Sequence, residues 1–131
     1  MEQHIREYFE DKKDVVAVYL FGSQATGKAG DRSDVDIGIV ADGKNPEPMI
    51  EKRLIFIVEL SRILRKDVHP VILNFASKQL IRQIFEKGKC ILVNDKKRLA
   101  RFKMFEFAEL ADFAYYQELT QSGFVRKVME A

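Results

Sequence analysis

The sequence is poor in cysteine and in net charge, and it has no long apolar run. Its 131 residues include a single cysteine, Cys90, so an internal disulfide is excluded, which fits a reducing compartment. No uninterrupted apolar stretch approaches the roughly 20 residues of a membrane span. The first 14 residues carry charges throughout and predict no signal segment. We therefore expect a cytoplasmic protein without a membrane association.

The formal net charge is only +2, from 22 Lys+Arg against 20 Asp+Glu. This balance argues against a protein that coats nucleic acid. The charge is unevenly distributed, because residues 77–104 carry nine basic and two acidic side chains. We interpret this basic band either as a solvated surface or as a contact for phosphates or an acidic partner. The length fits a single domain over residues 1–131, with no room for a separate substrate domain.

The hydrophobic pattern predicts one α/β domain. Continuous or alternating apolar runs rich in β-branched residues predict strands at 15–21, 35–40, 68–73 and 90–93. Helical spacing predicts helices at 3–13, 47–65 and 77–87, the last capped by Ser77 and ended by Gly88, and a long helix from about residue 96. Pro70 cannot donate to a ladder, so the third strand should lie at an edge or a bulge. In helix 47–65 we expect one apolar stripe to be buried: Ile50, Leu54, Ile57, Val58 and Leu64.

The stretch with the clearest chemical signal joins the first two predicted strands. Gly22-Ser23 follows the first strand, and Asp34 and Asp36 begin the second after ten intervening residues. Side chains two apart share a face of a strand, so the two carboxylates should project together. Two adjacent carboxylates repel unless a cation lies between them, and Mg²⁺ accepts one or two carboxylates together with substrate phosphates. Gly22 lets the backbone approach a ligand closely, and Ser23 adds a hydroxyl. The spacing therefore predicts a phosphate site facing a metal site.

A second motif overlaps this one. Residues 22–29, GSQATGKA, nearly match the phosphate loop G-x-x-x-x-G-K-[ST] that follows a strand. However, Ala29 stands where the hydroxyl ligand of Mg²⁺ belongs, and the loop residues 30–33 replace the required helix. Both departures disfavour a P-loop nucleoside triphosphatase.

The segment GSQATGKAGDRSDVDIGIV resembles the signature of the minimal nucleotidyltransferases of the DNA polymerase β-like superfamily, which include the MntA-type antitoxins paired with HEPN toxins. The resemblance covers about residues 15–107. It implies a small mixed sheet of about four strands flanked by helices, with a long C-terminal helix. It also implies an adenylyltransferase that uses ATP and Mg²⁺. On this resemblance Asp34 and Asp36 are the metal ligands and catalytic residues, and the nucleotide-binding residues are Gly22, Ser23, Lys28, Arg32 and Ser33.

The sequence departs from the family at the third predicted strand. The family places a third carboxylate there, but His69 occupies the matching position in VHPVILNFA. Three interpretations of this departure remain open. Asp67 shares the strand face of His69 and could replace the missing acid, or His69 could act as the base. Alternatively, the strand has lost its catalytic role.

The predicted C-terminal helix is unusually aromatic, with Phe102, Phe105, Phe107, Phe113, Tyr115 and Tyr116 in 15 positions. It either packs on its own chain or forms a protein–protein surface, for a homo-oligomer or for a toxin partner. Two functions follow from these features. One is transfer of AMP from ATP to a hydroxyl on a protein partner such as a HEPN toxin. The other is a catalytically degenerate module that neutralises its partner by contact.

Overall fold

A computed structural model describes residues 1–27 and 34–121 of the chain. The fold is α+β and centres on a four-stranded mixed sheet of order β3-β2-β1-β4. β1 pairs antiparallel with β2 and β4, whereas β2 and β3 are parallel. In chain order the elements are α1 (Glu2–Phe9), β1 (Val15–Phe21), α2 (Ser23–Thr26), β2 (Val35–Ala41), α3 (Pro48–Leu64), β3 (Val68–Ile72), the 3₁₀ turn η1 (Leu73–Phe75), α4 (Lys78–Lys87), β4 (Lys89–Val93) and α5 (Lys96–Gln121).

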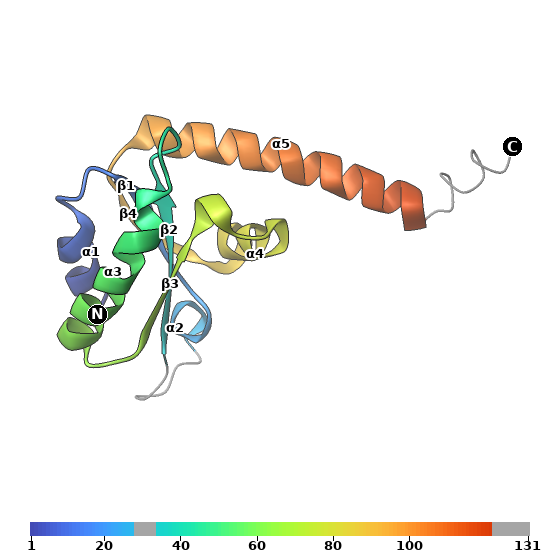
Figure 1. Cartoon of the computed structure of the whole chain (residues 1–131). Helices are drawn as coiled ribbons and strands as arrows, with labels where there is room; N and C mark the ends of the chain where they lie inside the picture. The colour runs from blue at the N-terminus through green and yellow to red at the C-terminus, as the bar shows by residue number, and fades with distance from the viewer. Residues whose placement is uncertain (28–33, 122–131) are drawn as a thin grey trace, which may run out of the picture.

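Helices cover both faces of the sheet, as Figure 1 shows, with α1 and α3 on one side and α4 and α5 on the other. Alternate residues of β1 serve the two faces. Val18 and Leu20 join the cluster that contains Phe9 of α1 and Leu60 of α3. Ala17 and Tyr19 join the second cluster with residues of α4 and α5, among them Ile84 and Leu99. Strands covered on both faces explain why VVAVYLF is a continuous apolar run.

Most of the predicted elements are confirmed, with shifts of a few residues at their ends. β3 is an edge strand, as Pro70 predicted. The Ser77 hydroxyl accepts a hydrogen bond from the Leu80 amide, which makes Ser77 the N-cap of α4. The first helix is shorter than predicted and ends at Phe9. α5 is long and extends beyond the sheet (Figure 1). None of the helices in the described ranges is long and apolar enough to span a membrane.

The predicted buried stripe of α3 is wrong at three of its five positions, whereas Leu64 is partly buried against the core and Ile57 is also partly buried. Ile50, Leu54 and Val58 are exposed, whereas Met49, Phe56 and Leu60 are buried. The ring of Phe56 packs edge-on against Phe9 of α1, with centroids 5.2 Å apart. The helix is apolar on two stripes, and the aromatic contact from α1 determines which one faces the sheet.

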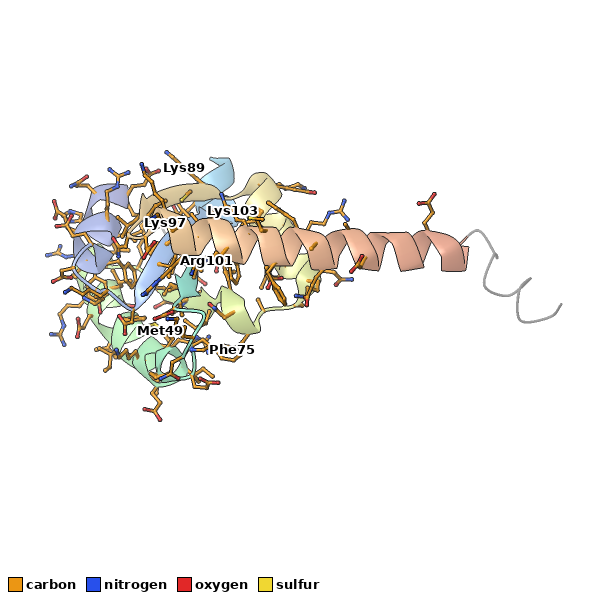
Figure 2. All side chains as sticks on the ribbon, turned by 90° about the horizontal axis from the view of Figure 1, so that it is seen from above. Met49, Phe75, Lys89, Lys97, Arg101 and Lys103 are labelled. Atoms are coloured by element: carbon orange, nitrogen blue, oxygen red, sulfur yellow. The ribbon has the colours of Figure 1, made fainter. Side chains whose placement is uncertain are left out.

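The basic band is partly neutralised within the chain. The pairs join Arg82 to Glu86, Lys89 to Glu2, Arg98 to Asp42 and Asp95, and Lys78 to Glu106 and Glu109. Of the remaining cations, Lys87 ends α4 and the other four lie on the first half of α5, where Figure 2 labels Lys97, Arg101 and Lys103.

Candidate functional site

The paired aspartates lie at the sheet edge where β1 ends and β2 begins. Phe21, the last residue of β1, lies opposite Asp36 in the antiparallel ladder. On the other side of β2, Asp36 lies opposite His69 in the parallel ladder with β3. Three consecutive strands thus bring Gly22, Asp36 and His69 to one end of the sheet, the lower end in Figure 1. Strand alternation predicted that Asp34 and Asp36 project together, and the family resemblance predicted that His69 occupies the matching position on the next strand.

Gly22 adopts a backbone conformation that only glycine tolerates, with φ 72° and ψ −150°. A Cβ atom at this position would lie 2.5 Å from Oδ2 of Asp36, well inside van der Waals contact. From the sequence we expected the backbone at Gly22 to approach a ligand closely. In the structure, the group against Gly22 is the Asp36 carboxylate itself. Gly22 therefore sets the position of that carboxylate as well as the turn into α2.

Asp34 and His69 are in direct contact. Oδ2 of Asp34 lies 3.0 Å from Nε2 of His69, and both side chains are about half exposed. Burial raises the pKa of the Asp36 carboxyl, the nearby His69 lowers it, and the neighbouring Asp34 raises it, with a net upward shift. The surroundings of Asp36 thus disfavour the negative charge of its carboxylate.

This arrangement fits a bound cation. A divalent ion would relieve the repulsion between Asp34 and Asp36 and offset the cost of burying Asp36. Within residues 1–27 and 34–121, no three His, Cys, Asp or Glu side chains are grouped as a complete metal site. Two carboxylates are nevertheless the protein ligand set that Mg²⁺ uses when substrate phosphates and water supply the rest.

The other predicted site residues have different outcomes. The Asp67 side chain is exposed. Its backbone carbonyl accepts a hydrogen bond from the amide of Val35, so Asp67 lies beside the first residue of β2. Within the described part of the chain, no hydrogen bond joins its carboxylate to Asp34 or Asp36. Ser23 begins α2, directly after Gly22. Lys28, Arg32 and Ser33 lie outside the described residues.

A cavity of about 440 Å³ lies away from these carboxylates. It is bounded by the end of β2, the loop that follows it, and the first half of α5, and its lining includes Lys44, Asn74, Arg98 and Arg101. None of the predicted site residues lines this cavity. Asp34 and His69 are about half exposed, so the predicted chemistry lies at an exposed end of the sheet and not in this cavity.

Solved structures with the same fold come from toxin–antitoxin complexes. A chain of a toxin–antitoxin complex crystallised with AMP-PNP is 25% identical, with a TM-score of 0.71 and 98% of each chain covered. A chain of the MntA–HepT complex is 22% identical, with a TM-score of 0.62 and coverage of 98% and 96%. A Shewanella oneidensis complex of a tri-AMPylated HEPN toxin with its MNT antitoxin gives 22% identity and a TM-score of 0.62, with 98% of this chain and 99% of that chain covered.

Comparison with curated protein sequences gives no significant match to this chain. The profile of the family "Polymerase beta, Nucleotidyltransferase" matches residues 3–97, which contain α1 to β4 and every predicted site residue. That match includes the Gly22 turn, the paired aspartates and the parallel β2–β3 pair described above. The chain therefore belongs to the polymerase β nucleotidyltransferase family.

Proposed function

We propose that this protein is a Mg²⁺-dependent adenylyltransferase that transfers AMP from ATP to a hydroxyl of a HEPN-type toxin and thereby acts as an antitoxin in the cytoplasm. The observation that carries the proposal is the pair Asp34 and Asp36, aligned beside the Gly22 turn at an open sheet edge. Two comparisons support the choice of nucleotide and acceptor. One similar complex was crystallised with AMP-PNP, and another contains an AMPylated toxin.

In this proposal Asp34 and Asp36 hold Mg²⁺, and Gly22 and Ser23 bind the triphosphate together with Lys28, Arg32 and Ser33. The bound ion would neutralise charge that develops on the phosphates. The raised pKa of Asp36 matters here, because a carboxylate that is poorly compensated in the free protein gains most from a cation. Magnesium and ATP should therefore bind in a mutually dependent way.

The reaction is an in-line substitution at the α-phosphorus of ATP. The acceptor hydroxyl oxygen forms a bond to the α-phosphorus, the bond from that phosphorus to the bridging oxygen breaks, and pyrophosphate leaves with its electron pair. The hydroxyl proton must pass to a base. His69 is our candidate for this base, because its imidazole contacts Asp34 and a ring nitrogen can accept a proton; Asp67, two residues earlier, is the alternative.

The test is transfer of label from α-labelled ATP to the partner protein in the presence of Mg²⁺. Changing Asp34→Asn together with Asp36→Asn should abolish labelling, because the neutral amides remove both anionic metal ligands. Persistence of label in the double variant would refute the assignment of the site. His69→Gln and Asp67→Asn, measured separately, identify the base: the one that matters should lower kcat by about 100-fold or more.

A contact-only mechanism is the second candidate, and it is motivated by His69 in place of the family's third acid. Under that mechanism, Asp34→Asn with Asp36→Asn would leave neutralisation of the partner intact, although no label is transferred. Loss of neutralisation together with loss of label would support the enzymatic function.

A further inference from the structure

The outer face of α3 is apolar and uncovered. Ile50, Leu54, Ile55 and Val58 are each more than half exposed, and Leu54 reaches 70%. These four side chains lie on the side of the helix opposite Met49, Phe56 and Leu60, which face the sheet. An aliphatic surface of this kind on adjacent turns marks an interface more often than a solvated surface.

Charge along the same face changes sign from one end to the other. At spacings of three and four residues, α3 carries Glu51, Leu54, Val58 and Ser61 on this face, and the cap residues Glu47 and Arg65 flank them at the two ends of the helix. We call these six residues the α3 outer stripe. The stripe is acidic at its start, aliphatic in its middle and basic at its end, where Arg62 lies beside Ser61. Of the ion pairs in the described part of the chain, none uses Glu47, Glu51, Arg62 or Arg65.

Such a stripe is complementary to itself when two copies run antiparallel. A two-fold axis level with Phe56 places Leu54 of one copy opposite Val58 of the other. The same axis places Glu47 opposite Arg65, and Glu51 next to Arg62, on both sides of the contact. The four-three spacing is that of the contact seam in paired helices.

We propose that this protein forms a homodimer in which the α3 outer stripes of two copies pack antiparallel across a two-fold axis. The charge pattern favours a second copy over other occupants. Helices that lie on membranes carry Lys and Arg along their polar face, whereas this stripe begins with two glutamates. The apolar surface continues from Ile50 into a hollow of about 260 Å³ beside Phe75 and the edge strand β3, which enlarges the contact; Figure 2 labels Phe75.

The first test is the mass of the purified chain by sedimentation equilibrium. The wild type should have twice the mass of one chain at micromolar concentrations. Leu54→Lys, which puts two like charges at the centre of the interface, should raise the dimer Kd by about 100-fold. The matched control is Met104→Lys on α5, because Met104 is 71% exposed and equally apolar. This control should remain dimeric, and far-ultraviolet circular dichroism verifies that both variants are folded.

The second test reverses the charges at the two ends of the stripe. Restoration of binding by the combined reversal is expected only if the partner is a second copy of the same chain. Glu51→Arg and Arg62→Glu should each weaken the dimer by about 10-fold, and the two changes in one chain should restore it. The proposal is overturned by a wild type that is monomeric up to about 1 mM, or by a double reversal that does not restore the dimer. It is also overturned if Met104→Lys dissociates the dimer and Leu54→Lys does not, since the contact is then on α5.

Discussion

Gly22 and Gly27 flank α2 with nearly the same φ angle, 72° and 73°, but their surroundings differ. Gly22 lies against the Asp36 carboxylate, whereas no atom of the described residues lies within 4 Å of a Cβ built on Gly27. The ψ angles also differ, because Gly27 is in the ordinary left-handed region and Gly22 is not. Gly27 is therefore a control for a positive φ next to α2 without a contact to Asp36, although the conformation of Gly22 is the less tolerant of a side chain.

Gly22→Ala should lower AMP transfer by about 100-fold, because the new methyl group displaces the Asp36 carboxylate by a sizeable fraction of an ångström or more. Gly27→Ala should lower the free energy of unfolding by about 1 kcal/mol and leave transfer within about three-fold of the wild type. Initial rates of labelling and urea unfolding curves for both variants give the comparison. Equal losses of activity in the two variants would show that the Asp36 contact has no role.

At the residue scale, the sequence predicted which side chains meet but not how tightly. Strand alternation placed Asp34 and Asp36 on one face, and the position of His69 on the next strand placed it near them. The contact of Gly22 with Asp36 was not predictable, because it depends on the register of β1 against β2. The sequence does not encode that register in any local pattern.

At the scale of elements, a partly buried ion pair joins α4 to α5. The Lys78 ammonium lies 2.7 Å from the Glu106 carboxylate and also contacts Glu109. Glu106 is only 5% exposed, so its charge depends on this lysine. Burial lowers the pKa of Lys78, but hydrogen bonds and negative charge from Glu106 and Glu109 raise it by more. The pKa of Lys78 is therefore above the ordinary value of 10.5.

Lys78→Met should lower the free energy of unfolding by about 2 kcal/mol at pH 7, because it leaves the Glu106 carboxylate buried without a partner. Since the folded pKa of Lys78 is raised, its stabilising contribution is complete below about pH 10.5 and is lost as the pH rises through the folded value. The difference between wild type and variant in urea unfolding should thus be constant from pH 7 to 9 and shrink above pH 10.5.

Arg82→Met is the control for this pair, because Arg82 and Glu86 are both more than half exposed and their pair should contribute no more than about 0.5 kcal/mol. Adding Glu106→Gln to Lys78→Met should recover at least half of the lost stability, since it removes the unpaired charge. A double variant as unstable as Lys78→Met would mean that the lysine stem, rather than its charge, holds α4 against α5.

The two faces of α3 show where prediction from periodicity ends. Ten apolar residues in this helix form two overlapping stripes, so a 3.6-residue period is satisfied by either one. Phe9 and Tyr8 of α1 select the inner stripe through edge-on contacts with Phe56. A helix predicted with more apolar surface than one sheet face can cover is therefore itself a signal of an interface.

At the scale of the whole molecule, the end of the sheet that carries Asp34 and Asp36 lies opposite the end at which α5 starts. The backbone of Asn94, just before α5, donates to Val16 at the beginning of β1, whereas Gly22 follows the end of that strand. The distance along β1 between Val16 and Gly22 is roughly 20 Å at the usual strand rise. A partner that rests on α5 and presents a hydroxyl to Asp34 and Asp36 must therefore span the length of the sheet, as Figure 1 makes visible.

The exposed side chains Met104, Phe105 and Phe107 on α5 are the surface on which we expect this partner to rest. Met104→Lys should raise KM for the partner by about 10-fold while kcat and KM for ATP stay within about two-fold, because the site lies at the other end of the sheet. Ile63→Lys, an exposed aliphatic position of α3 that is outside its outer stripe, is the matched control and should change none of the three constants. A fall in kcat with an unchanged KM for the partner would place the effect of Met104 in the chemical step and remove α5 from partner recognition.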